Sequence, residues 1–231
     1  MSALPAESVT TFDLSTTPLR EVNQALHAAG LSGEFVVKNP AGAHNVAVGV
    51  DAPVKITVDG HCGYFAAGMN QQAEIAIHGN AGQGLAENQM SGVVHVTGSA
   101  SQSAGATGRG GLLIVDGDAG ARCGISMKGI DIVVGGSVGH MSAFMAQRGT
   151  LVVRGDTGEA LGDSLYEAHL YVRGVVRSLG ADCVEKEMRP EHLEELAGLL
   201  KAAGYGDDDL SAYRRYGSAR TLYHFHAQNT Y

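Results

Sequence analysis

A glycine occupies every nineteenth position through the middle of this chain, seven times, with no insertion or deletion between the copies. These marker glycines are Gly60, Gly79, Gly98, Gly117, Gly136, Gly155 and Gly174. Aliphatic residues stand four and two positions before every one of them, beginning with Ile56 and Val58. An apolar alternation with a period of two predicts a short β-strand in each copy, with both aliphatic rows on one side.

The constant period predicts that these strands stack as a solenoid. Hairpins would join neighbouring strands by short turns, whereas about a dozen residues without strong helical periodicity separate the strands here. A chain that returns to the same place at every nineteenth position is best explained by coiling. We therefore predict an all-β fold, a single parallel β-helix of about seven coils with short terminal helices.

Two rows of small residues fit this coil. We expect glycine at the marker positions because the backbone turns a corner at each strand end, where glycine adopts a positive φ at little cost. Seven positions later, a second row never exceeds alanine, which predicts close approach of the coils inside a narrow solenoid. This row is Ala67, Ala86, Gly105, Gly124, Ala143, Gly162 and Ala181.

The N-terminal end departs from the repeat. Phe35 and Val37 reproduce the row spacing, but Gly60 lies two positions further from Asn39 than the regular period requires, which predicts a distorted first coil. Before it, Thr17 as N-cap and a first-turn proline predict a helix that Gly30 ends.

The C-terminal end predicts a second helix from Pro190 to Ala203, and we expect both helices to cap the open ends of the solenoid. The chain then divides into an N-terminal segment with a capping helix (1–34), the β-helix (35–183), and a C-terminal helix with a tail rich in aromatic residues and arginine (184–231). That tail fits either a partner interface or a segment folded back on its own solenoid.

Composition narrows the function classes. A net charge of −8 argues against nucleic acid or an anionic membrane as the main partner. No apolar run is long enough to span a bilayer, and the first residues lack the pattern of a secretory signal. Cys62, Cys123 and Cys183 are never in a CxxC pair, so we expect reduced thiols in a cytoplasmic protein.

The residues capable of chemistry do not converge in the predicted coil. Four histidines recur at every seventeenth position, but the structural period is two positions longer, so they drift around the coil and cannot stack. They are His44, His61, His78 and His95. The three cysteines fall two, six and nine positions after a marker glycine, so they cannot share an iron–sulfur cluster. The pair His224 and His226 lacks a nearby third metal ligand.

Two further patterns have structural interpretations. The glycine-rich stretch 105–111 lacks the Gly-Lys-Ser/Thr ending of a phosphate loop. The residues just before the marker glycines are expected to form an outward polar ladder: Asp59, His78, Thr97, Asp116, Gly135, Arg154 and Arg173. Its two arginines would repel unless a carboxylate, for example from a partner, lies between them. We therefore predict no catalytic, cofactor-binding or metal-binding residue on this chain.

Several segments resemble a known family. They are Met90-Ser91-Gly92, Gly110-Gly111-Leu112, the run from Arg122 to Gly129 and the run from Gly162 to Glu167. Together with the repeated Gly-x-x-Gly corners, they resemble the GXGXG β-helix domain that closes the large subunit of glutamate synthase. They are more similar still to its free-standing relatives, the β-helix polypeptide of N-methylglutamate synthase and the GlxC-type proteins. The resemblance runs from about Asn39 to the C-terminus and implies a right-handed coil.

The resemblance implies a division of labour between subunits. A class-II amidotransferase-like subunit would handle the amine chemistry, and a separate subunit would carry FMN and iron–sulfur clusters. The present chain would be a non-catalytic structural subunit that links the two and holds no cofactor itself. Whether the product is N-methylglutamate or glutamate depends on those partners. Two other classes stay open: a stand-alone β-helix enzyme acting on polysaccharide or acyl groups, and a homo-oligomeric binding module.

Overall fold

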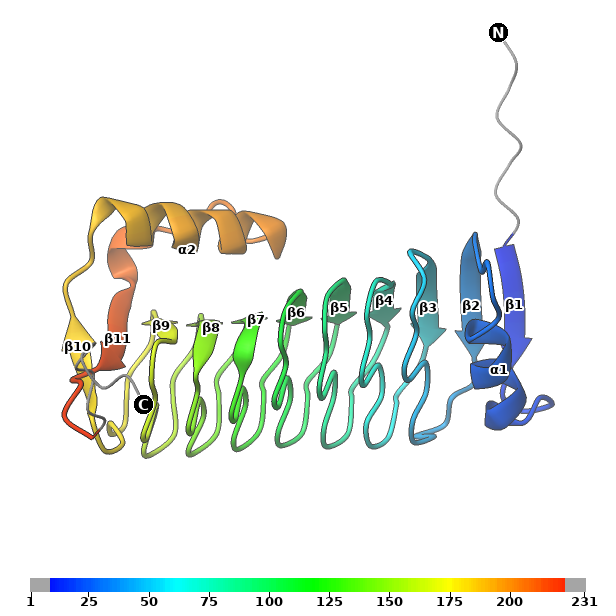
Figure 1. The fold of residues 1–231 in the computed structure, drawn as a ribbon, viewed down its shortest axis with the longest axis horizontal. Helices are drawn as coiled ribbons and strands as arrows, with labels where there is room; N and C mark the ends of the chain where they lie inside the picture. Colours follow the sequence, from blue (N-terminus) through cyan, green and yellow to red (C-terminus); the bar gives the residue numbers. More distant parts are fainter. Residues whose placement is uncertain (1–8, 223–231) are drawn as a thin grey trace, which may run out of the picture.

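The computed structural model describes residues 9–222 as one elongated stack of coils (Figure 1). Eleven strands form a single sheet in the order β1-β2-β3-β4-β5-β6-β7-β8-β9-β11-β10. The coil strands are β2 (Glu34–Lys38), β3 (Lys55–Asp59), β4 (Glu74–Ile77), β5 (Val93–Val96), β6 (Leu112–Val115), β7 (Lys128–Val134), β8 (Arg148–Val153) and β9 (His169–Val172). The predicted parallel β-solenoid is confirmed.

The predicted register is confirmed as well. Ile56 pairs with Ile75 and Val58 with Ile77 in parallel strands, and both aliphatic rows keep this offset, equal to the sequence period, through β9. One irregularity lies at the start of β7, where Lys128 pairs with Arg148. In the distorted first coil, Phe35 pairs with Ile56, so the extra two positions of this coil lie outside the strands. A second parallel ladder of single bridges joins the coils two positions after the marker glycines, from Cys62 to Val176.

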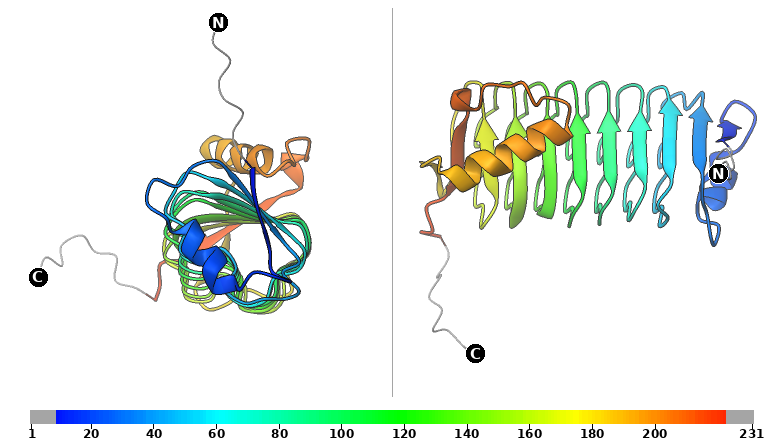
Figure 2. Two further views of the ribbon diagram at one scale, coloured as in Figure 1. Left: turned by 90° about the vertical axis from the view of Figure 1, so that its right-hand side faces the viewer. Right: turned by 90° about the horizontal axis from the view of Figure 1, so that it is seen from above.

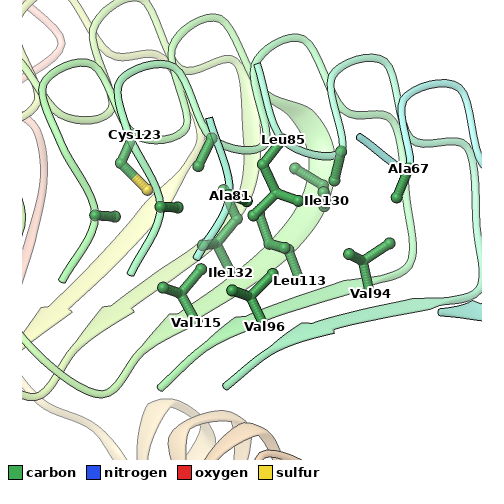
Figure 3. Close-up of a cluster of buried hydrophobic side chains, with 14 of the residues drawn as sticks. Ala67, Ala81, Leu85, Val94, Val96, Leu113, Val115, Cys123, Ile130 and Ile132 are labelled. Atoms are coloured by element: carbon green, nitrogen blue, oxygen red, sulfur yellow. The ribbon is translucent and has the colours of Figure 1, made fainter. Parts of the chain in front are cut away.

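The aliphatic rows fill the interior of the coils. Val94, Leu113 and Ile132 point into the interior from consecutive strands and belong to one buried cluster with Leu85 and Cys123 from the opposite wall of the coils (Figure 3). All five are fully buried. Burial of apolar surface at about 25 cal/mol per Å² makes this continuous row of contacts the main stabilising term of the solenoid.

The structure corrects the reason for glycine at the marker positions. Of the seven, only Gly60 has a positive φ. The others allow a close approach of consecutive coils: a Cβ on Gly155 would lie 2.7 Å from the carbonyl carbon and oxygen of Gly136. Side chains are excluded at this corner by the neighbouring backbone, not by the local φ.

Left-handed backbone occurs instead five, seven and nine positions after each of the first six marker glycines. In the first of these coils the three residues are Phe65, Ala67 and Met69, with φ between 54° and 60°. Their amides alternate in direction, because Phe65 and Met69 donate to the next coil and Ala67 to the preceding one. These hydrogen bonds to both neighbours hold a conformation that costs L-residues about 1–2 kcal/mol each.

The N-terminal end carries one strand more than the sequence predicted. Strand β1 (Val9–Asp13) adds in parallel to β2 and forms the outermost edge of the sheet. Helix α1 (Leu19–Leu26) lies across the open end of the coils (Figure 2) and buries Val22 and Leu26. Asn23 fixes it there, because its side chain donates to Asn45 O and accepts from Ala47 N.

The limits of α1 differ from the prediction. Pro18, not Thr17, occupies the N-cap position, and no side chain caps the first turn. The helix ends at Leu26 rather than near Gly30, because the amides of His27 and Ala28 bond to carbonyls only three positions back. The chain thus leaves the helix through tight turns before it reaches the glycine.

Helix α2 (Pro190–Ala202) begins at the predicted residue and ends one residue before the predicted Ala203, but it lies in a different place. It runs along the outer face of the sheet over β7 to β9, not across the C-terminal end (Figure 2). Leu196 and Leu200 pack there on an outward row of apolar side chains. This row is Ile114, Val133, Val152 and Tyr171, all buried. The helix is placed by this apolar patch, which outweighs the exposed end of the stack.

The C-terminal end is closed by strands. After the short 3-10 helix η1 (Leu210–Ala212), β11 (Arg214–Ser218) inserts between β9 and β10 (Cys183–Lys186) and is antiparallel to both. The tail up to Ser218 therefore folds back on its own solenoid. His224 and His226 lie outside the described residues. Within residues 9–222, neither helix is long and apolar enough to cross a membrane.

Candidate functional site

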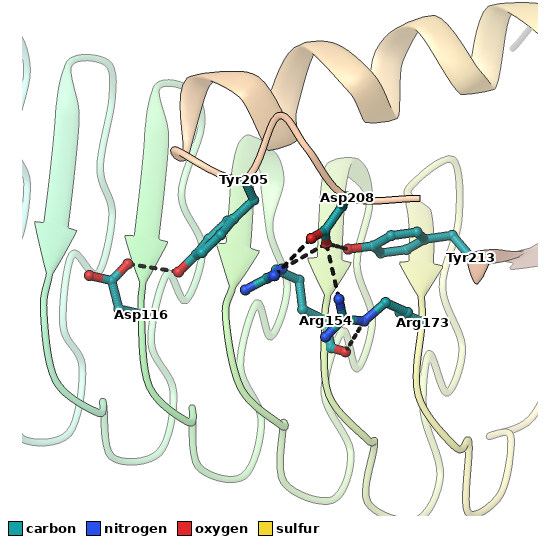
Figure 4. Close-up of polar contacts among 6 residues, drawn as sticks. All are labelled: Asp116, Arg154, Arg173, Tyr205, Asp208 and Tyr213. Atoms are coloured by element: carbon teal, nitrogen blue, oxygen red, sulfur yellow. Dashed lines mark hydrogen bonds and ion pairs between the residues drawn. The ribbon is translucent and has the colours of Figure 1, made fainter. Parts of the chain in front are cut away.

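The outward polar ladder receives its carboxylate from the same chain. Asp208 accepts two hydrogen bonds from Arg154, from Nε and Nη2 at 2.8 Å each, and a third from Arg173 Nη1 at 3.3 Å (Figure 4). Tyr213 OH donates to the same carboxylate at 2.7 Å. The expected repulsion between the two arginines is thus relieved by the segment that follows α2, without a partner.

A tyrosine continues this network along the sheet. Tyr205 OH donates to Asp116 Oδ1 at 2.8 Å, and the Arg154 guanidinium lies 3.8 Å from the centre of the Tyr205 ring. Burial and the hydrogen bond to Asp116 raise the pKa of Tyr205 to about 12. Hydrogen bonds from Arg154 and Tyr213 hold the pKa of Asp208 at about 2. The phenol therefore stays protonated and the carboxylate ionised near neutral pH.

A second polar cluster lies under the middle of α2. Glu195 accepts from Thr150 Oγ1 at 3.2 Å, pairs with His169 Nδ1 at 2.8 Å and accepts from Tyr171 OH at 2.5 Å. Burial alone would raise the pKa of Glu195, but the hydrogen bonds from His169 and Tyr171 outweigh it and lower the pKa to about 2. Nearby Asp131 has a raised pKa, chiefly because it is buried.

A third polar feature joins the coils one position after each marker glycine. Each of the first six side chains in this row accepts a hydrogen bond from the main-chain amide of the next member of the row, at 2.7–3.1 Å. The row is His61, Asn80, Ser99, Asp118, Ser137, Asp156 and then Val175, which offers no acceptor and is largely exposed. The unbroken run of acceptor-bearing side chains is the sequence signal that could have predicted this ladder.

The four regularly spaced histidines do not come together, as predicted. His44 Nδ1 accepts from the amide of Tyr64 at 2.8 Å, and His61 belongs to the ladder just described. His78 pairs with Asp59 at 3.1 Å and His95 with Asp116 at 2.9 Å. Each imidazole has its own partner in a different part of the coil. Among the described residues, no group of three or more histidine, cysteine or acidic side chains could hold a metal ion.

The three cysteines also occupy separate places. All are free thiols within the core, and burial raises the pKa of each to about 12. A thiol with such a pKa is a poor nucleophile and a poor metal ligand near neutral pH. Their role in the described part of the chain is to fill apolar space.

These contacts hold α2 and the segment after it on the outer face of the sheet. Arg154, Tyr171 and Glu195 bond to groups of the chain itself, and their pKa shifts follow from burial and from those bonds. The fold and this site define a parallel β-solenoid whose own C-terminal segment is bound along its outer face.

Comparison with known proteins adds the family. No family model matches the chain, and no solved structure matches it. Protein GlxC of Rhizobium meliloti (strain 1021) is 60% identical over 220 residues, which cover 94% of this chain and 96% of that protein. The chain therefore belongs to the GlxC family. This confirms the GlxC-type part of the resemblance, while the relationship to the GXGXG domain of glutamate synthase stays a prediction.

Proposed function

We propose that this chain is the non-catalytic structural subunit of a heteromeric, glutamate synthase-like complex in the cytoplasm. In this proposal it links a class-II amidotransferase-like subunit to a subunit that carries FMN and iron–sulfur clusters. The reaction proposed for the complex is the synthesis of N-methylglutamate. The observation that carries the proposal is the unbroken stack of coils, whose internal positions are used by packing and by contacts between coils.

The stack has the mechanical properties that a linking subunit needs. The parallel strands from β1 to β9 stand side by side, which gives a rod about 38 Å long at about 4.8 Å per step. Each coil is held to the next by strand pairing, by the second bridge ladder and by the side-chain ladder. Such a rod holds two partners at a constant separation, because bending it requires several of these contacts to break together.

Affinity purification tests the proposal directly. The chain would be expressed with the products of its neighbouring genes and purified through a tag. We expect co-purification of two larger subunits, one of them with a flavin absorbance spectrum. Omitting the chain should separate these two subunits and lower the synthase activity at least tenfold. Synthase activity of the chain alone, or full activity of the two partners without it, would contradict the proposal.

Activity assays on the same purified complex identify its substrates. With methylamine and glutamate as substrates, the complex should form N-methylglutamate. If the reaction proceeds only with an ammonia source and yields glutamate, the chain serves a split glutamate synthase instead. A chain that co-purifies only with copies of itself would favour the homo-oligomeric binding module.

A further inference from the structure

A polar cavity of about 250 Å³ lies where the C-terminal strands meet the first turn of α2. Four of the side chains around it are permanent cations: Lys186, Arg189, Arg215 and Arg220. Glu167 is the one carboxylate among its lining residues, and it is already paired with Arg220 at 3.0 Å. Arg189 forms an ion pair at 3.1 Å with Glu187, which does not line the cavity. The cavity therefore keeps an excess of positive charge.

Two of these cations face each other across paired strands. Lys186 of β10 lies directly opposite Arg215 of β11 in the antiparallel register. Within residues 9–222, neither forms an ion pair with a carboxylate. Like charges directly opposite each other in a sheet are destabilising. Between Arg154 and Arg173, the protein resolves the same conflict by placing Asp208 within hydrogen-bond distance of both.

Arg215 has hydrogen-bonding capacity in reserve. Its Nη1 donates to the main-chain oxygen of Glu187 at 3.3 Å and its guanidinium also interacts with the Tyr171 hydroxyl, while its Nε is buried without a hydrogen-bond partner. A guanidinium group presents several donors in one plane, a geometry that matches the oxygens of a carboxylate or a phosphate.

The first turn of α2 forms part of the cavity wall. His192 in the first turn of α2 lines the cavity, and its pKa is lowered by burial and by the charge of Arg215. The dipole of α2 favours negative charge at its amino end, where Glu191 already stands in the first turn. The helix end, the unpaired cations and the cavity therefore favour the same class of ligand.

We propose that this cavity binds a small oxyanion, of the carboxylate or phosphate class, between Lys186 and Arg215. The bound group would separate these two cations in the same way that Asp208 separates Arg154 and Arg173. The oxyanion comes either from a free small molecule or from an acidic side chain of a docked protein, since both present the same chemistry. The site does not depend on the function proposed above.

The test is thermal unfolding of the full chain at constant ionic strength, with chloride replaced stepwise by a probe. Inorganic phosphate represents a free oxyanion, and aspartate blocked at both ends represents a protein side chain. We expect a saturable rise in Tm, of about 3 °C at a probe concentration about ten times its Kd. Lys186→Gln and Arg215→Gln should each abolish this rise.

The matched control is Arg214→Gln, which removes the same charge from the adjacent position of β11, where Arg214 contacts Gly174 O rather than the cavity. This variant should respond to the probe as the unaltered chain does. Without the probe, Lys186→Gln should be at least as stable as the unaltered chain, because it relieves the repulsion. This variant keeps the test decisive if Arg215→Gln fails to fold.

The two probes distinguish a free oxyanion from an acidic side chain of a docked protein. A response to phosphate but not to blocked aspartate identifies a free oxyanion, and the reverse response identifies a side chain of a protein. A response to both supports the site for either source. No rise with either probe, or an equal loss of response in Arg214→Gln and Arg215→Gln, overturns the proposal.

Discussion

Asp208 binds Arg154 through both of its carboxylate oxygens, at 2.8 Å each, across 54 positions of the sequence. The two side chains are only 10% and 20% exposed. This pair, more than the end of the stack, determines where the segment after α2 lies. A bidentate arginine–carboxylate contact that is shielded from water is among the stronger polar contacts in proteins.

Replacing Asp208 by Asn should destabilise the protein by about 3 kcal/mol, because two stacked arginines lose their shared counter-charge. Urea unfolding measures the change. Asp207→Asn is the matched control, since Asp207 is the exposed neighbour on the same turn, and its effect should stay within about 0.5 kcal/mol. Equal effects of the two substitutions would show that the contact contributes nothing to stability.

Acid should release the C-terminal segment before the coils unfold. The pKa of Asp208 falls from 3.8 to about 2 on folding, and that of Glu195 from 4.5 to about 2. A depressed folded pKa gives stability that is complete above the unfolded value and is lost as the pH falls through the folded value. Limited proteolysis after α2 should therefore increase between about pH 4 and pH 2. An Asp208→Asn, Glu195→Gln double variant should lose most of this dependence on pH.

Substitution by alanine should cost more at Gly155, a marker glycine without a positive φ, than at Gly124, whose φ is positive. In Gly155→Ala, the new Cβ meets backbone atoms at 2.7 Å, and we expect a loss of about 2–3 kcal/mol. In Gly124→Ala, φ is +69° but the nearest atoms are side-chain atoms at 3.3 Å, and the loss should be about 1 kcal/mol. Chemical denaturation of the two variants gives the order, and the reverse order would contradict the close-approach explanation.

The side-chain ladder should be measurable one hydrogen bond at a time. Asp118 Oδ1 accepts from the amide of Ser137 at 2.7 Å, so Asp118→Ala should cost about 1 kcal/mol. Hydrogen exchange should show the loss of protection at Ser137, with little change at more distant coils. Asp118→Asn keeps an acceptor oxygen and serves as the control. If Ser137 exchanges at the same rate in both variants, the bond is not formed in solution.

The coil could be predicted from the sequence because its aliphatic and glycine positions repeat with a constant period. Rows such as Ile56, Ile75 and Val94 report the interior directly, and their constant spacing predicts the register that the structure shows. The structural reason for a given residue type in a row was harder to predict. Glycine is compatible with a positive φ and with close approach alike, and only the backbone distances at positions such as Gly155 distinguish the two.

The site on the outer face could not be derived from local patterns. Asp208 lies in a segment without periodicity, and its pairing with Arg154 depends on where α2 comes to rest. One signal was present, because the outward row changes from Thr57, Ala76 and His95 to apolar residues from Ile114 onward. Strand β11 had no such signal, since it runs against the direction of the repeat and pairs outside its period.

The insertion of β11 between β9 and β10 has a consequence for the order of folding. Coils can form by successive addition, because each new strand pairs with the strand of the coil just before it in the sequence. Strand β11 must instead wait until α2 has formed and the chain has reversed, since its partners Leu170 and Tyr171 precede the whole of that helix. In the described sheet β10 pairs with β11 and not with β9, so β10 joins the sheet only through β11. This end of the rod therefore closes as a unit of two strands and not coil by coil.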